Sequence, residues 1–260
     1  MPGNNMSSLI QKIARQAYVT FKSAGSSASN FKVFLENQDL LGSLLTEIRA
    51  IDLRLAPRKR KTSSKGLDNS PPVTYMHICE TDTFSMGVFL LKSGASIPLH
   101  DHPGMNGMLK VLYGKVSIRC FDKLDKPPDA EIETHFEPPL LPCQRDALRR
   151  SVLGTVSVFT EESGPCILSP HKDNLHQIDA LDGPAAFLDI LAPPYDPDDG
   201  RDCHYYQVLQ PISESVDRKP GEMWLLEIPQ PADFWCGGEP YPGPEIKSHI
   251  SQLASVTLWK

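Results

Sequence analysis

The hydrophobic pattern of this chain changes near residue 74, from the spacing of helices to the short apolar runs of β-strands. Before that point, apolar residues recur at helical spacing in segments 6–23 and 30–50, which a Ser/Ala/Gly run separates. The apolar stripe of the first segment consists of Leu9, Ile10, Ile13, Ala17 and Phe21. This pattern predicts two helices, of which the first is amphipathic and packs on the rest of the protein.

Beyond residue 74 the apolar runs are short and broken by Gly or Pro, as expected for β-strands. They fall at 86–91, 97–102, 108–113, 115–121, 155–159, 165–168, 175–179, 186–191, 205–210 and 223–228. Tyr113-Gly114-Lys115 predicts a tight hairpin turn, and segment 180–184 predicts another. The charged, Pro-rich segment 122–150 predicts a long loop. Ten or so short strands with frequent turns predict a mainly β fold, either a sandwich or a small barrel.

The same pattern predicts three parts: a helical segment (1–53) on the barrel, a linker (54–73) and a β domain (74–260). The linker opens with a basic run from Arg54 to Lys65, which is compatible with a nuclear localisation signal. Because Ser and Pro continue to Pro72, we favour a solvated linker. Residues 1–35 contain no acid, as in mitochondrial transit peptides, but the amphipathic helix explains them better.

Composition narrows the class of protein. The 260 residues are 40% hydrophobic, enough for a sizeable core, and the net charge of −6 argues against nucleic acid as a partner. The six Cys lie far apart without a CxxC pair, which favours reduced thiols in the cytoplasm. No apolar run reaches 18 residues, so we expect neither a membrane span nor a membrane partner.

His100 and His102 are the strongest candidate metal ligands. Residues i and i+2 of an extended strand point to the same face, so both imidazoles can reach one ion. A third ligand should come from a facing strand, and His176 begins an alternating strand in the second half of the domain. His171 is the rival, but it sits in a loop of turn-forming residues.

The segment around these histidines resembles the first metal-binding motif of cupins. Gly94 precedes His100 by the motif's spacing, and Gly114 follows His102 by twelve residues. Where that motif has a Glu ligand, this chain has Gly107. Three neutral imidazoles would leave the full +2 charge of an iron ion uncompensated, which favours an anionic ligand such as a thiolate. Zinc is also compatible with three His. The resemblance implies a cupin: a double-stranded β-helix, or jelly-roll barrel, here with N-terminal helices.

Two longer stretches are similar to the cysteamine dioxygenases and plant cysteine oxidases. They run from Ile97 to Gly114, IPLHDHPGMNGMLKVLYG, and from Phe187 to Tyr195, FLDILAPPY. The resemblance implies Fe(II) as cofactor, held by His100, His102 and His176. It implies an enzyme that adds O₂ to the thiol of cysteamine, giving hypotaurine, and to the N-terminal cysteine of proteins.

Further expectations follow from that resemblance. Oxidised N-terminal Cys would feed the arginylation branch of the N-degron pathway, so the enzyme would sense oxygen. Its partners would be small aminothiols, O₂ and proteins with a free N-terminal Cys, such as regulators of G-protein signalling. Independently of the resemblance, the cysteine pattern favours the cytoplasm, and we expect a monomer, although the sequence leaves the oligomeric state open.

Four more residues are candidates for the site. If segment 180–184 were a hairpin turn, Asp189 would face His176 and could orient an imidazole or attract the substrate amine. Tyr195 leaves a strand after two prolines and could donate a hydrogen bond near O₂. Cys203 and Tyr205 share a strand face at i and i+2, which permits the Cys–Tyr thioether known in related thiol dioxygenases.

Two other classes of function stay open from the sequence. One is a Zn- or Mn-dependent cupin isomerase or hydrolase, which metal analysis would distinguish. The other is a metal-free cupin that acts as a binding protein, against which the three histidines argue.

Overall fold

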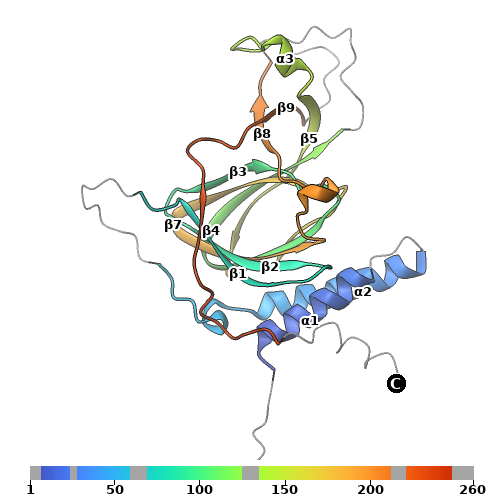
Figure 1. Ribbon diagram of the computed structural model, residues 1–260, viewed down its shortest axis with the longest axis vertical. Coiled ribbons are helices and arrows are strands. Elements are labelled where there is room, and N and C mark those ends of the chain that lie inside the picture. The colour runs from blue at the N-terminus through green and yellow to red at the C-terminus, as the bar shows by residue number, and fades with distance from the viewer. Residues whose placement is uncertain (1–6, 24–27, 59–68, 125–134, 212–220, 248–260) are drawn as a thin grey trace, which may run out of the picture.

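The computed structural model describes residues 7–23, 28–58, 69–124, 135–211 and 221–247. It shows two long N-terminal helices packed against a β-barrel (Figure 1). Half of the predicted linker (54–73) and part of the predicted loop (122–150) lie outside these residues.

Both predicted N-terminal helices are present, as α1 (Leu9–Lys22) and α2 (Ala28–Glu47). The Ser8 hydroxyl caps α1 by accepting a hydrogen bond from the Gln11 backbone N–H at 3.4 Å. The buried face of α1 includes most of the predicted stripe, namely Ile10, Ile13, Ala17 and Phe21. A short 3₁₀ helix, η1 (Ala50–Leu53), follows α2. No helix in the described part of the chain is both long and apolar enough to cross a bilayer.

The rest of the fold is one ten-stranded sheet in the order β10-β1-β2-β7-β3-β8-β9-β5-β4-β6. An additional pairing of β7 with β4 joins strands far apart in that order, and it closes the barrel. The fold is therefore mainly β, a cupin barrel with N-terminal helices. The strands and short helices are β1 (Val73–Glu80), β2 (Ser85–Leu91), β3 (Ser96–His100), β4 (Asn106–Lys123), α3 (Pro142–Arg145), β5 (Leu148–Thr160), β6 (Cys166–Leu168), β7 (Leu175–Ala192), η2 (Pro197–Asp199), β8 (Tyr205–Leu209), β9 (Glu222–Ile228) and β10 (Cys236–Gly238).

The sheet is buried on both faces where β2, β4 and β7 meet. Along the second half of β7, Ala186, Leu188 and Ile190 pack in a core shared with α1 and α2, whereas Ala185 and Phe187 face the barrel interior. Such a strand is apolar at nearly every position, which explains the continuous hydrophobic run in the sequence. The helices and the barrel thus share one hydrophobic core. The predicted division of the chain at residues 53 and 73 stays a prediction.

Neither predicted hairpin turn exists. β4 continues from Asn106 through Gly114 to Lys123, and β7 continues through segment 180–184. The pairing of the two strands is irregular here, and Gly114 has a φ of +76°. A Cβ atom at residue 114 would lie 2.4 Å from the Pro184 carbonyl oxygen, so only Gly fits. Gly and Pro mark strand irregularities as readily as hairpin turns, which is why the local pattern misled.

Candidate metal centre and pocket

Three histidine rings meet in the barrel. His100 ends β3, His102 follows two residues later, and His176 lies directly opposite His100 on β7. The ring centroids are 4.8 Å apart for His100–His102 and for His100–His176, and 4.6 Å apart for His102–His176. All three side chains are buried, and one ligand atom from each lies within 4.8 Å of the others. The arrangement could hold one metal ion. The rival, His171, is exposed in a turn and is not part of this group.

The surroundings of these rings suit metal binding. The Nδ1 atoms of His100 and His102 lie 2.8 Å from the backbone carbonyl oxygens of Pro98 and Asn174 respectively. Since a carbonyl only accepts, each Nδ1 carries the proton and each Nε2 keeps its lone pair. Burial lowers the pKa of all three rings, to about 3 for His102 and well below the ordinary value for His176. Neutral imidazoles are the form that binds metal, so the donor set fits a divalent cation.

Gly107 explains why this donor set lacks a carboxylate. β4 pairs Gly107 with Leu191 of β7 and with Leu168 of β6. A Cβ atom at residue 107 would lie 2.8 Å from Leu168 Cγ, well inside the usual carbon–carbon contact distance. Leu168 thus occupies the space that a side chain at residue 107 would enter. Within the described residues, the three-histidine group contains no Asp or Glu.

A buried acid that sequence reasoning missed holds the His-x-His segment in place. The Asp101 carboxylate, only 2% exposed, accepts hydrogen bonds from Lys123 Nζ at 2.6 Å, Tyr206 OH at 2.9 Å and the His204 backbone N–H at 2.9 Å. Burial alone would raise the pKa of Asp101, but the Lys123 ammonium and the other donors lower it overall. The Asp101 carbonyl oxygen also accepts from Tyr195 OH at 2.7 Å. These bonds tie the ligand segment to β4 and β8, which orients the two imidazoles.

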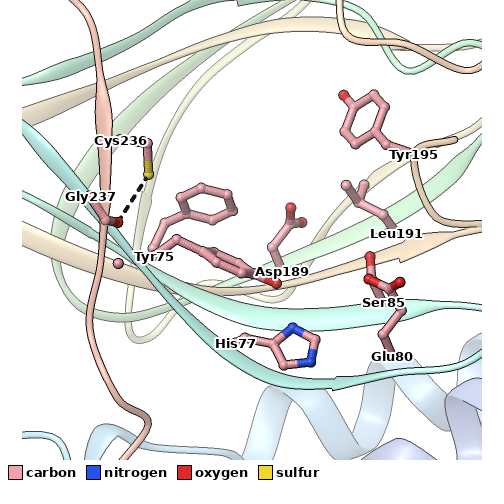
Figure 2. A pocket seen from close by; sticks show the side chains of 11 residues that line it. Tyr75, His77, Glu80, Ser85, Asp189, Leu191, Tyr195, Cys236 and Gly237 are labelled. Atoms are coloured by element: carbon pink, nitrogen blue, oxygen red, sulfur yellow. Dashed lines mark hydrogen bonds between the residues drawn. The ribbon is translucent and has the colours of Figure 1, made fainter. Parts of the chain in front are cut away.

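Beside the histidines lies a pocket of about 520 Å³ between β1, β2, β7 and β10 (Figure 2). Its polar groups include Tyr75, Asp189 and Tyr195, and Phe89 and Leu191 supply apolar walls. The Tyr195 ring centroid is 5.8 Å from that of His102, so this side chain connects the pocket to the histidine group. Tyr195 thus lines the pocket and also neighbours the histidine group.

Asp189 enters this pocket, but not by the predicted pairing. Asp189 and His176 lie on the same strand, so the predicted hairpin that would have placed them opposite each other is wrong. Instead, Asp189 pairs with Gly87 of β2 and Leu109 of β4. Its carboxylate points into the cavity (Figure 2). Burial raises the pKa of this carboxyl group to about 7, against a smaller lowering by the Ile190 backbone N–H.

Tyr195, Cys203 and Tyr205 gather at the edge of the histidine group. Tyr205 pairs with His100, and their ring centroids are 6.3 Å apart. The Cys203 thiol contacts the hydroxyls of both tyrosines, and burial raises the pKa of this thiol to about 11. Cys203 precedes β8, so it does not share a strand with Tyr205 as the i, i+2 argument assumed. The thioether between Cys203 and Tyr205 stays a prediction; all six cysteines are unpaired thiols here.

Two histidines of unassigned role also have defined surroundings. His77 lines the pocket from β1, and the His204 ring lies 3.2 Å from the Asp101 carboxylate. The sequence contains no local signal for either position, because each depends on strands that pair across the barrel. From the sequence alone, both histidines are predicted to be surface or core residues without a role in the site.

Comparison with known proteins agrees with this geometry. The family model PCO_ADO matches residues 44–246. A 2-aminoethanethiol dioxygenase from Mus musculus is 61% identical over 258 residues, which cover 95% of this chain and 99% of the mouse protein. The 2-aminoethanethiol dioxygenase of Homo sapiens is 60% identical, with the same coverage of both chains. Plant cysteine oxidase 1 of Arabidopsis thaliana is 31% identical, and the match covers 80% of this chain and 71% of the plant protein. This chain therefore belongs to the PCO_ADO family.

Proposed function

We propose that this chain is a thiol dioxygenase that uses Fe(II) and O₂ to oxidise cysteamine and the N-terminal cysteine of proteins. The observation that carries the proposal is a buried group of three neutral imidazoles, without a carboxylate, beside Tyr195, which also lines a pocket that contains Asp189. Membership of the PCO_ADO family supports the enzyme class, since its relatives include 2-aminoethanethiol dioxygenases.

The reaction adds both atoms of O₂ to a thiol, R–SH + O₂ → R–SO₂H. Cysteamine becomes hypotaurine, and an N-terminal cysteine becomes its sulfinic acid. A metal ion held by His100, His102 and His176 would supply the redox chemistry. Because these ligands are neutral, they leave the charge of the cation uncompensated, which favours the thiolate form of the substrate.

The side chains of the pocket provide recognition of the rest of the substrate. The Asp189 carboxylate is suited to bind the substrate ammonium group. The Tyr195 hydroxyl donates its hydrogen bond to the Asp101 carbonyl oxygen, so toward a substrate the hydroxyl oxygen can act only as an acceptor. Phe89 and Leu191 provide apolar walls that a bound substrate would cover. The pocket volume of about 520 Å³ is far larger than the volume of cysteamine, which has only four non-hydrogen atoms. The pocket therefore has room for the residues that follow an N-terminal cysteine.

The cellular part of the proposal follows from this chemistry. An N-terminal sulfinic acid would direct its protein into the arginylation branch of the N-degron pathway, so the enzyme would act as an oxygen sensor. Regulators of G-protein signalling are the proposed protein substrates. We propose that the chain acts in the cytoplasm as a monomer.

Metal loading followed by mass spectrometry tests the function. The metal-free protein is loaded without oxygen with Fe(II), Zn(II) or Mn(II), then exposed to air with a peptide that begins with Cys. We expect a mass gain of two oxygen atoms with Fe(II) only, and none on a peptide whose N-terminus is acetylated. Oxidation of both peptides at equal rates would show that the amine is not recognised. Activity with Zn(II) or Mn(II) alone would favour the alternative cupin enzymes.

Asp189 should make the stability of the metal-free protein depend on pH in a defined direction. The carboxyl group titrates near 3.8 when unfolded and near 7 when folded, so between these values the folded state binds more protons. The free energy of unfolding is therefore expected to fall as pH rises through this window and to level off above it. Asp189→Asn removes this contribution, so its stability relative to wild type should increase with pH.

Urea unfolding of both proteins at about pH 5 and about pH 8 measures this difference. The comparison cancels the contribution of the histidines, which acts in the opposite direction because their pKa values are lowered. Asp182→Asn, at an exposed position of the same strand, is the control. A constant difference between wild type and Asp189→Asn at both pH values would contradict the raised pKa.

A further inference from the structure

The row of residues that crosses β1, β2 and β7 in the pocket has a glycine at its centre. His77 pairs with Gly87, and Gly87 pairs with Asp189. A Cβ atom at residue 87 would lie 2.3 Å from three atoms of Tyr75, including its hydroxyl oxygen. The end of the Tyr75 ring therefore occupies the space above Gly87, next to Asp189. Figure 2 shows the ring extending along the pocket wall toward Asp189.

The Tyr75 ring is held in this position by other aromatic side chains. Its centroid is 4.9 Å from that of Phe89, which in turn lies 5.3 Å from that of Phe187 in the barrel core. The hydroxyl, in contrast, has no hydrogen-bond partner among the described residues, and it belongs to the pocket lining. Burial and then the charge of Asp189 raise the pKa of Tyr75, so the hydroxyl keeps its proton and remains a donor. A positioned donor without a partner is available for a ligand.

We propose that Tyr75 is a specificity-determining residue, whose hydroxyl donates a hydrogen bond to the carbonyl oxygen of the substrate's N-terminal residue. The inference rests on the proposed function and adds a feature to it: Asp189 binds the ammonium group, which cysteamine and peptides share, and Tyr75 binds the carbonyl, which only the peptide has. Asp189, when ionised, only accepts, so the neighbouring donor complements it.

The spacing of the two groups agrees with this assignment. Directly paired residues have Cβ atoms about 5 Å apart, so the Tyr75 hydroxyl lies within roughly 8 Å of the Asp189 Cβ. In the N-terminal residue of a peptide, the amine nitrogen and the carbonyl oxygen are about 3 Å apart. One hydrogen bond of about 2.9 Å from the amine to Asp189, and another from the Tyr75 hydroxyl to the carbonyl oxygen, can therefore span a gap of that size. Cysteamine ends at its amine and leaves the Tyr75 hydroxyl without a partner.

A pair of matched small substrates tests the proposal. Cysteine amide carries the carbonyl group, and 2-amino-3-methylbutane-1-thiol has an isopropyl group of nearly the same shape in place of the carboxamide. We expect the Fe(II)-loaded wild type to favour cysteine amide in kcat/KM, mainly through KM. Tyr75→Phe, which keeps the ring above Gly87, should reduce this preference by between about threefold and tenfold, the usual effect of one hydrogen bond. Its kcat/KM for cysteamine should stay within about twofold of wild type.

Controls separate this result from damage to the fold. The preference is a ratio measured on one preparation, so it does not depend on the fraction of active enzyme. Tyr241 packs against the helix-side core, and its hydroxyl has no hydrogen-bond partner among the residues that the structure describes. Tyr241→Phe should therefore leave kcat/KM for both substrates unchanged. Gly87→Ala, whose Cβ displaces the Tyr75 hydroxyl, should lower the preference as Tyr75→Phe does.

The outcomes distinguish this proposal from the proposed function. If the wild type oxidises none of the three thiols, the proposed function fails. If the wild type oxidises them but Tyr75→Phe keeps the full preference for cysteine amide, the role of Tyr75 is overturned and the dioxygenase stands. An equal loss on cysteamine and cysteine amide would also overturn it, because a role in packing would affect both.

Discussion

Replacing His176 with alanine is expected to abolish metal binding and thiol oxidation together. The substitution removes one of three imidazoles whose ligand atoms lie within 4.8 Å of one another, and no carboxylate in the group can take its place. Loss of a ligand should cost more than the ten- to hundredfold typical of outer contacts, so we expect activity to fall by more than about a hundredfold. His100→Ala and His102→Ala should behave alike, because the three rings form one group.

Metal content after gel filtration and oxidation of a Cys-starting peptide are the two measurements. His171→Ala is the matched control, since His171 is exposed and lies only five positions from His176 in the sequence. Thermal unfolding of the metal-free proteins verifies that each variant folds. Normal metal content and normal oxidation in His176→Ala would refute the assignment of the third ligand.

Gly107→Glu is expected to reduce activity strongly, for two reasons that further variants can separate. Any Cβ atom at residue 107 meets Leu168, so a steric cost is expected even for Gly107→Ala. The Glu variant also introduces a negative charge on the interior face of β4, which would lower the net charge of the metal site and compete with substrate for coordination. We expect activity to fall by more than about tenfold.

Trimming Leu168 isolates the effect of charge. Leu168→Ala vacates the space next to residue 107, so the double variant Gly107→Ala, Leu168→Ala should regain activity that Gly107→Ala loses. The double variant Gly107→Glu, Leu168→Ala should remain impaired. Equal recovery of both double variants, measured by peptide oxidation at saturating Fe(II), would attribute the whole effect to crowding and would remove the argument from charge.

The local pattern of the chain was sufficient for several parts of the structure. The helical stripe around Ile13 and Ala17 defines α1, because burial of one helix face depends only on residue spacing. The series of short apolar runs broken by Gly or Pro likewise indicates a β-barrel or sandwich, because the length and spacing of strands are also local features of the sequence. His100 and His102 are close in sequence, so their proximity in space follows from two residues of extended chain.

Tertiary structure decided every feature that depends on which strands pair. Gly114 and segment 180–184 contain turn-forming residues, yet each strand continues past them with an irregular register, because β4 and β7 pair on both sides of this place. The same error led to the predicted pairing of Asp189 with His176. Asp189 nevertheless enters the site, because it faces the barrel interior from the opposite end of the same strand.

The site itself shows the same division. The three-histidine group and its likeness to cupins can be read from the sequence, since His100 ends a recognisable strand, His102 is two residues farther along and His176 lies at the start of another strand. The partners of Asp101 cannot be read in this way, because Lys123 and Tyr206 are 22 and 105 residues away. The position of Tyr75 above Gly87 likewise depends on contact between neighbouring strands. Sequence spacing determines what is near along one strand, and only the closed barrel determines which strands face one another.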